Sequence, residues 1–373
     1  MKINIFQNRI SFLILIIIMT VFGGLTQFLA YSNMTHTFSI SNIWKILIPI
    51  LVGWIFFMVV QFSNIRSLFK FKWVWLGLAI FLMAFTVYFS FNFYHQTHCI
   101  SIGGVSIYSG HWVILLYILF LTGNNELKTK KRDKETTKKN TWKIIIEILL
   151  NLVLLFVIAA AMGNQIFFAL MLIFVINLII VKAPKWILVL AASIFILITV
   201  VFLIRDNHTQ RINAFLSDKP SISRSYQATE CLNSFEIGGL TGIGVKPSPR
   251  VEGNKYLLPW PTSHTCFAVI IEHFGIIGGL ATLLLFVYFV YFGMMVYRRN
   301  KGSSEGFMII LLLWIFVFYS LIHILNNLGL FPHGSIISFF SMSRDFNIIT
   351  MITAGLLYKI AKSERDAIGI DVP

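Results

Sequence analysis

The chain has 373 residues, of which 57% are hydrophobic and 12% are charged, and its formal net charge is +15 at pH 7. Soluble domains carry about 25% charged residues, so this composition excludes an ordinary soluble protein. Runs without any Asp, Glu, Lys or Arg lie between Arg9 and Lys45 and between Lys72 and Glu126. Each run exceeds the roughly 20 residues that cross a hydrocarbon core, which predicts an all-α integral membrane protein.

The apolar segments predict about ten transmembrane helices in a single polytopic domain spanning residues 1–373. The polar stretch "YHQTHCISIGG" separates the third helix from the fourth. The ten predicted spans lie at residues 10–31, 44–62, 73–93, 107–122, 144–161, 165–181, 186–204, 267–297, 307–328 and 336–358.

The basic residues predict the orientation. Most of the 30 lysines and arginines fall in alternate connections between the spans, which the positive-inside rule places in the cytoplasm. Both termini and the basic loop 123–143 are therefore expected to be cytoplasmic, with that loop near anionic lipid headgroups. Because the charge lies in these connections, it indicates membrane topology and gives no reason to expect nucleic acid. The long loop 205–266, between spans 7 and 8, is expected outside.

The outer loop is the candidate site. It contains the turn-forming stretches "EIGGLTGIGVKPSPRVEGNK" and "LPWPTSHT", and loops held on a rigid scaffold are where sites tend to lie. Its lysines and arginines, at the level of the outer headgroups, would suit a phosphate-bearing lipid. The alternative is ordinary anchoring at the membrane interface.

An acid is predicted inside the membrane span that follows this loop. Glu272 is expected one to two turns into span 8, where an acid costs roughly 2.5–3.5 kcal/mol near the membrane centre and so suggests a function. The alternative is an ion pair within the bundle, for example with Arg344.

The cysteines, Cys99, Cys231 and Cys266, fit no metal-binding spacing, so no protein metal site is predicted.

Three stretches carry a resemblance to a known family: "RSYQATECLNSFEIGGLTGIGVKPS", "KYLLPWPTSHTCFAVIIEHFGIIGG" and "NNLGLFPHGSIISFFSMS". They resemble the SEDS family (shape, elongation, division and sporulation), of the FtsW/RodA/SpoVE type. The residues at matching places are Arg211, Phe215, Tyr226, Gln227, Gly239, Gly242, Gly244, Leu258, Pro259, His264, Thr265, Phe267, Glu272 and Gly275.

The resemblance implies an activity, a partner and a location. SEDS proteins polymerise lipid II, the undecaprenyl-pyrophosphate-linked precursor of peptidoglycan, at the outer face of the bacterial cytoplasmic membrane. They work with a class B penicillin-binding protein during cell division or elongation. In such a reaction a sugar hydroxyl attacks the donor's anomeric carbon, and a base takes the hydroxyl proton. Cationic groups or a divalent cation would stabilise the departing lipid pyrophosphate.

The chain departs from the family pattern at the expected base. The family's aspartate at the junction of loop and helix is replaced by Cys266, and a thiol of ordinary pKa about 8.5 is a poor base at neutral pH. The catalytic candidates are therefore Glu272, His264 and Cys266. The substrate-binding candidates are Arg211, Tyr226, Gln227, Lys246, Lys255, Pro259 and Thr265.

Two hypotheses of different kinds follow. The chain is a lipid II glycosyltransferase that uses a displaced base, or it is a non-catalytic SEDS-like scaffold that positions a class B penicillin-binding protein. Phosphate-binding basic residues without a usable acid would favour the scaffold.

Overall fold

The computed structural model forms two compact units, each described here by itself. The first comprises residues 1–62, 203–296 and 316–373, and the second comprises 63–202 and 297–315. The residues that the structure describes are 5–35, 40–92, 100–102, 105–107, 109–130, 164–180, 185–204, 225–252, 255–330, 335–341 and 344–368. Arg211 and the predicted span 144–161 lie outside them.

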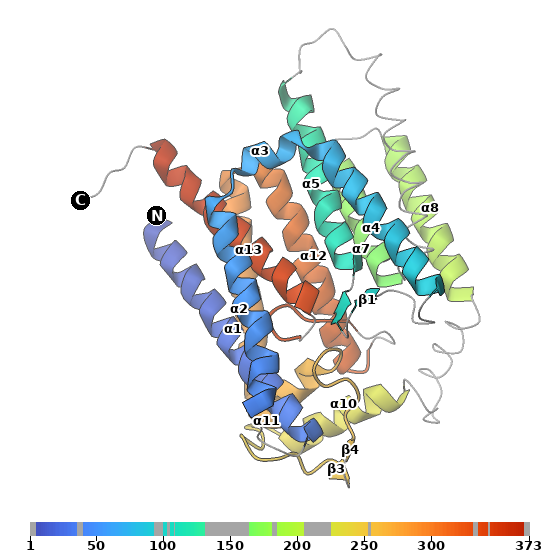
Figure 1. Cartoon of the computed structure of the whole chain (residues 1–373), viewed down its shortest axis with the longest axis vertical. Coiled ribbons are helices and arrows are strands. Elements are labelled where there is room, and N and C mark those ends of the chain that lie inside the picture. Colours follow the sequence, from blue (N-terminus) through green and yellow to red (C-terminus); the bar gives the residue numbers. More distant parts are fainter. Residues whose placement is uncertain are drawn as a thin grey trace. The chain divides into compact units, whose positions relative to one another are not determined.

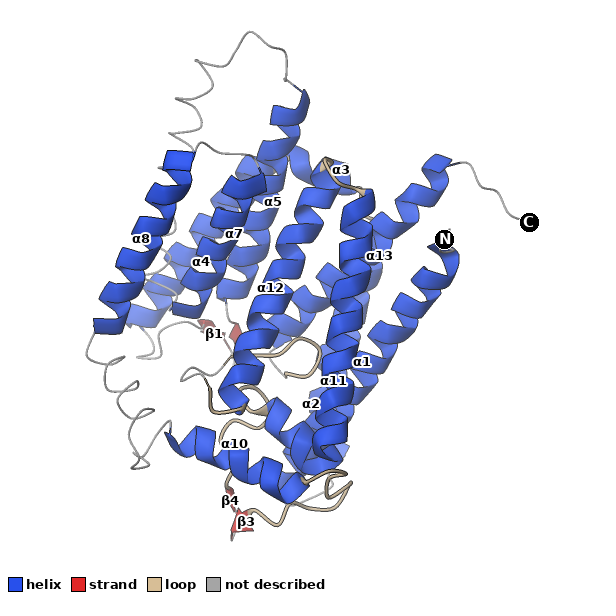
Figure 2. Ribbon diagram, turned by 180° about the vertical axis from the view of Figure 1, so that it is seen from behind, coloured by secondary structure: helices blue, strands red, loops and turns tan. Residues whose placement is uncertain are grey.

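The first unit contains the outer-loop elements and the helices around them. In Figures 1 and 2, α10 lies across the end of this unit at which α1 ends, opposite the N-terminal end of α1. The last turns of α13 lie at that N-terminal end, as expected if both termini share one side. The elements of this unit are α1 (Ile5–Thr35), α2 (Ile40–Phe62), α10 (Ser225–Gly238), β3 (Val251–Glu252), β4 (Lys255–Tyr256), α11 (Cys266–Arg299) and α13 (Arg344–Ile368), with part of α12 (Ser304–Asn327).

Helices α2 and α13 approach closely because small residues lie at their contact. A Cβ at Gly53 would press against Met351, and one at Gly355 would meet the backbone of Phe57. The side chain of Gln61 donates to the carbonyl of Gly355 (3.0 Å). Small residues and interhelical hydrogen bonds of this kind are typical of helix packing in membranes.

In the second unit, α4 packs along α5, where the hydroxyls of Thr86 and Ser109 form a hydrogen bond (2.6 Å). Two short antiparallel strands pair Ile100, in the polar stretch predicted between spans 3 and 4, with Ile107, where span 4 was predicted to begin. The elements of this unit are α3 (Ile65–Lys70), α4 (Lys72–Asn92), β1 (Ile100–Ile102), β2 (Val105–Ile107), α5 (Ser109–Lys130), α7 (Asn164–Ile180) and α8 (Lys185–Ile204).

The structure confirms the helical membrane class. Among the described residues, four helical stretches are long and apolar enough to cross a membrane: Arg9–Thr35, Ile43–Phe62, Cys266–Arg299 and Ser304–Asn327. Helix α11 exposes Ile276, Leu280, Leu284 and Val287 along one face, an arrangement suited to lipid. Shorter apolar helices occur at four further predicted spans. The total of ten stays a prediction.

Three predicted segments differ in part from the structure. The last helix begins at Arg344 rather than near residue 336, because residues 335–341 form a turn segment. The segment 205–266, expected to be a loop, contains α10 and the β3–β4 hairpin. Helix α5 continues to Lys130, so the start of the predicted basic loop 123–143 is helical, and residues 131–143 lie outside the described part.

Helix α11 is broken at Gly275, whose φ of 67° and ψ of −172° are not helical. The break removes the acceptors that the N–H groups of Ile276 and Ile277 would have four residues back. These two groups donate instead to the carbonyls of Gly239 and Leu240 (2.9 and 3.2 Å). We call residues 238–244 the glycine turn.

The same turn satisfies the carbonyls on the other side of the break. The carbonyl of Glu272 accepts from Ile243 (3.0 Å), and that of His273 accepts from Gly244 (2.9 Å). Two lost helical bonds are thus replaced by four bonds to the turn. This exchange fixes the outer loop on the membrane helix, because backbone groups left unpaired in an apolar setting are costly.

We expect Gly275→Ala to destabilise the protein strongly. Alanine would be strained at this positive φ, and its Cβ would overlap the carbonyl of Leu240. Gly239→Ala is the matched control, because Gly239 also has a positive φ (50°) but open space around it. Thermal unfolding in detergent should show Gly275→Ala less stable than the control by about 1–3 kcal/mol. Equal melting temperatures would contradict this packing.

Candidate functional site

Glu272 lies at the centre of a buried polar cluster. Its side chain is fully buried, and its Oε2 accepts hydrogen bonds from Ser234 of α10 (2.7 Å) and from Tyr256 of β4 (3.1 Å). Burial raises the pKa of the Tyr256 phenol well above its ordinary value, and the negative charge of Glu272 raises it further. The phenol therefore stays protonated and donates to the carboxylate.

The cation of this cluster is Arg250, just before β3. Its guanidinium is buried, forms an ion pair with Glu230, and lies 3.8 Å from Oε2 of Glu272. It also donates to the carbonyl of Glu230 (2.6 Å) and to the hydroxyl of Ser234. The structure thus gives Glu272 the partner Arg250, where the sequence suggested Arg344. Glu272 holds α10, the β3–β4 hairpin and α11 together, and it offers no surface to a substrate.

Loss of the guanidinium should therefore be severe. We expect Arg250→Ala to lower stability by about 3–5 kcal/mol, because two buried carboxylates would be left without a cation. Arg298→Ala is the control, since that arginine is exposed at the end of α11. Melting temperatures in detergent provide the comparison. A fall no larger than that of the control would show that the cluster does not hold the loop.

The junction between loop and helix is built on the carbonyl of Trp260. This oxygen accepts from the N–H groups of Ser263, His264 and Thr265 (3.0, 3.0 and 3.3 Å). The hydroxyl of Thr265 donates to the carbonyl of Pro259 (2.8 Å). Pro259 and Thr265, predicted to bind substrate, therefore contribute to the shape of the loop.

Cys266 begins α11 and is fully buried. Its thiol donates to the carbonyl of Ser263 (3.2 Å) and lies 3.7 Å from the hydroxyl of Ser341. The side-chain amide of Gln27 lies 3.4 Å from the sulfur. A thiol so enclosed has no access to a substrate in this conformation.

His264 is the predicted catalytic residue that the structure leaves half-buried. Its Nδ1 lies 3.1 Å from the carbonyl of Ser335, which can only accept, so Nδ1 carries the proton. In the neutral imidazole the lone pair is then on Nε2. His323 has the same tautomer, because its Nδ1 donates to the same carbonyl (2.8 Å) while its Nε2 accepts from the N–H of Phe267 (3.3 Å).

Two predicted substrate-binding residues hold α10 in place. The Tyr226 hydroxyl donates to the carbonyl of Leu257 (3.0 Å), and the Gln227 amide donates to Oδ1 of Asn326 (3.0 Å). Both side chains are half-buried. Their roles toward a substrate stay predictions.

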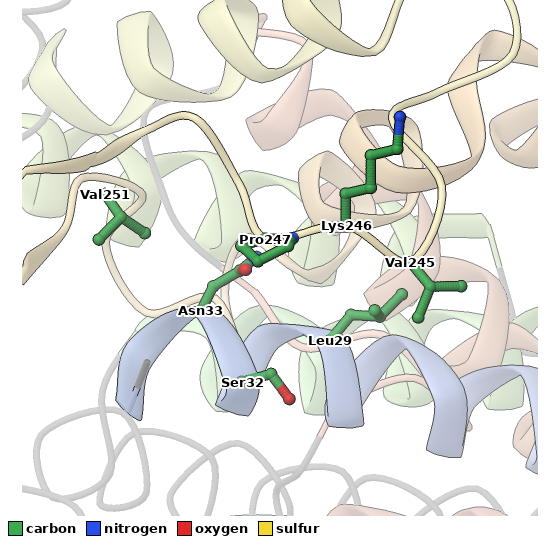
Figure 3. A pocket seen from close by; sticks show the side chains of 7 residues that line it. All are labelled: Leu29, Ser32, Asn33, Val245, Lys246, Pro247 and Val251. Atoms are coloured by element: carbon green, nitrogen blue, oxygen red, sulfur yellow. The ribbon is translucent and has the colours of Figure 1, made fainter. Parts of the chain in front are cut away.

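Lys246 and Lys255 are exposed. Lys246 borders a small pocket of about 110 Å³ between α1 and the loop after the glycine turn. Figure 3 shows Asn33 reaching toward Pro247, whereas the ammonium of Lys246 extends away from α1. The lining is mostly apolar with this cation at its rim. The lining residues are Leu29, Ser32, Asn33, Val245, Lys246, Pro247 and Val251.

Among the residues that the structure describes, no group of three or more His, Cys, Asp and Glu side chains is placed to hold a metal ion. A divalent cation carried by a pyrophosphate stays a prediction.

Sequence reasoning missed the partners of the candidate residues. Arg250 and Glu230 were visible only as two of many loop charges. His273 was not selected, although it donates through Nδ1 to the carbonyl of Gly244 (2.7 Å) and lies with Nε2 2.9 Å from Nδ2 of Asn33. The sequence signal that could have found these residues is their position as polar residues near the glycine-rich stretch.

A comparison with known protein families supports the helical membrane fold described above. A family model described as "Cell cycle protein", of the FtsW, RodA and SpoVE group, matches residues 6–366. The chain belongs to this family. The resemblance found in the outer loop is thereby confirmed, and the chain is a multi-pass membrane protein.

Curated relatives of this family member are named as enzymes. A probable peptidoglycan glycosyltransferase FtsW of Pseudomonas fluorescens (strain SBW25) is 32% identical over 152 residues, which are 39% of this chain and 36% of the relative. The protein of the same name from Nitrosococcus halophilus (strain Nc4) is 28% identical over 163 residues, 42% of this chain and 41% of the relative. The chain thus spans less than half the length of the curated relatives it matches.

Solved structures show the same fold over nearly the whole chain. The rod shape determining protein RodA of Thermus thermophilus matches with a TM-score of 0.65 and 14% identity, over 95% of this chain and 96% of that one. A chain from a peptidoglycan synthase complex, described as coordinating polymerization and crosslinking, matches with a TM-score of 0.73 and 15% identity. That match covers 95% of this chain and 97% of the other. At these identities the likeness concerns the fold alone.

Proposed function

We propose that the protein is a peptidoglycan glycosyltransferase that polymerises lipid II at the outer face of the bacterial cytoplasmic membrane. The observation that carries this proposal is the match of the family model to residues 6–366, which include the outer loop and its junction with α11. The names of the relatives, peptidoglycan glycosyltransferase, supply the reaction. The bias of basic residues supports cytoplasmic termini and an outer position for the loop.

In this proposal His264 is the base. Its Nδ1–H bond to Ser335 orients the ring and leaves the lone pair on Nε2, the arrangement by which a histidine accepts a proton from a nucleophilic hydroxyl. Cys266 is enclosed, and Glu272 already accepts bonds from Ser234 and Tyr256. Of the three predicted catalytic residues, the half-buried imidazole is the one best placed to reach a substrate.

Lys246 and Lys255 are the proposed contacts of the lipid pyrophosphate. Exposed ammonium groups on the outer loop can approach a phosphate without prior desolvation, and the apolar pocket beside Lys246 suits the first part of a polyprenyl chain. Arg211, which lies outside the described residues, is proposed from the sequence alone to assist them. A divalent cation bound to the pyrophosphate would act with these charges.

The second candidate function is a non-catalytic scaffold. It is favoured by the enclosed thiol at Cys266 and by the buried ion pair of Glu272, which leave the outer loop without an accessible carboxylate at the expected base position. In both candidates the proposed partner is a class B penicillin-binding protein, since the structural neighbour belongs to a complex that also crosslinks.

The base assignment predicts opposite results for two variants. His264→Asn keeps an amide donor for the Ser335 carbonyl but removes the base, so polymerisation should fall roughly 100-fold or more. Glu272→Gln keeps an acceptor for Ser234 and Tyr256 and removes one of two buried negative charges, so activity should stay within about tenfold of wild type. The assay is lipid II polymerisation in proteoliposomes with the partner present.

The result is judged with melting temperatures beside the rates. Active His264→Asn together with inactive but folded Glu272→Gln would transfer the role of base to the carboxylate. Partner binding without polymerisation, in the wild type as well, would favour the scaffold.

The lysine contacts predict a loss that depends on salt. Lys246→Ala and Lys255→Ala should each weaken binding of undecaprenyl pyrophosphate by roughly two- to fivefold at low ionic strength, because exposed charge pairs contribute about 0.4–1 kcal/mol. The loss should shrink at high salt. Lys301→Ala, an exposed lysine in the connection between α11 and α12, is the matched control and should bind as wild type does. Equal affinities for all three variants would refute these contacts.

A further inference from the structure

Trp260 is a feature of the outer loop that the proposed base and phosphate contacts do not use. It lies between Pro259 and Pro261, its side chain is 69% exposed, and its φ is 53°. A positive φ is uncommon for any residue other than glycine and is an outlier for a bulky one. Backbone strain of this kind tends to persist where a function requires it.

The strain is held by the backbone and not by packing of the indole. The Trp260 carbonyl accepts the three N–H groups that begin the approach to α11, and the Pro259 carbonyl accepts the hydroxyl of Thr265. None of these bonds involves the indole. Glycine would adopt the same backbone with less strain, so the fold does not explain why a tryptophan stands here.

The protein groups around the indole suit a polar ligand that has one apolar face. The indole meets the imidazole of His264 edge to face, with 6.4 Å between ring centroids and 73° between planes. Half-buried Thr262 and Ser263 follow it in the same turn. A pyranose ring has an apolar C–H face, which packs on the electron-rich face of an aromatic ring, and hydroxyls that bond to neighbouring polar groups.

We propose that Trp260 is a stacking platform for a sugar ring of the lipid-linked disaccharide, beside His264. This inference rests on the proposed function, because the sugar is that of lipid II. It adds which part of the substrate the loop recognises: the lysines contact the pyrophosphate, and the indole contacts the sugar. A role for the indole as a membrane-interface anchor is the alternative that the experiment must separate.

Two ligands that share the polyprenyl pyrophosphate, of which only one carries the disaccharide with its peptide, provide the test. The full-length protein in nanodiscs is titrated with labelled lipid II and with undecaprenyl pyrophosphate, which lacks the disaccharide and peptide. Trp260→Gly should weaken lipid II binding roughly tenfold, equivalent to about 1.4 kcal/mol, and leave undecaprenyl pyrophosphate binding unchanged. Trp260→Phe, which keeps an aromatic face, should stay within about threefold of wild type.

The melting temperature of Trp260→Gly shows whether a loss of binding comes from misfolding. Its melting temperature should change little, because relief of backbone strain offsets the greater freedom of glycine in the unfolded chain. Trp44→Ala removes another exposed indole, at the start of α2, and should alter neither affinity.

The outcomes separate this inference from the proposed function. If the wild type prefers lipid II and Trp260→Gly loses that preference, the platform holds even where no polymerisation is measured. Equal losses for both ligands, or no preference in the wild type, would overturn it in favour of an interface anchor. Failure of polymerisation alone would count against the proposed enzyme.

Discussion

The break of α11 at Gly275 is the constraint on which the outer loop depends. Unpaired backbone groups in a membrane helix are costly, so the groups freed by the break need partners. The glycine turn supplies them on both sides of the break, with N–H groups for two carbonyls and carbonyls for two N–H groups. The loop and the helix therefore depend on each other for their hydrogen bonds, and neither is expected to keep its shape without the other.

The buried charges extend this constraint from the backbone to the side chains. Glu272 lies on the turn of α11 just before the break, and its carboxylate binds α10 through Ser234 and the hairpin through Tyr256. Arg250 partly balances the two carboxylates of the cluster. Such a network contributes little to the net stability of the fold, but removing one of its members is costly. It therefore favours one loop arrangement over others. An acid inside a span can thus be structural.

Hydropathy alone placed most membrane helices, because a run of apolar residues has few alternatives to a spanning helix. It did not place α10, because the prolines and glycines of the outer segment predict a loop, whereas "SYQATECLNSFEIG" forms a helix. Nor could it choose the partner of Glu272 among many loop charges, since that choice is made by tertiary packing. Helix α11 begins at Cys266, at the predicted junction of loop and helix. The enclosure of Cys266 could not be predicted, because it depends on Gln27 and Ser341, which are remote in sequence.

The carbonyl of Ser335 accepts from both His264 and His323, which lie in the outer loop and in α12. The two imidazoles therefore share the lone pairs of a single oxygen. The two rings are therefore energetically coupled: a change that draws the oxygen toward one weakens its bond to the other. Substitutions at the two histidines should not be additive, and a displacement of residues 335–341 would alter both rings together.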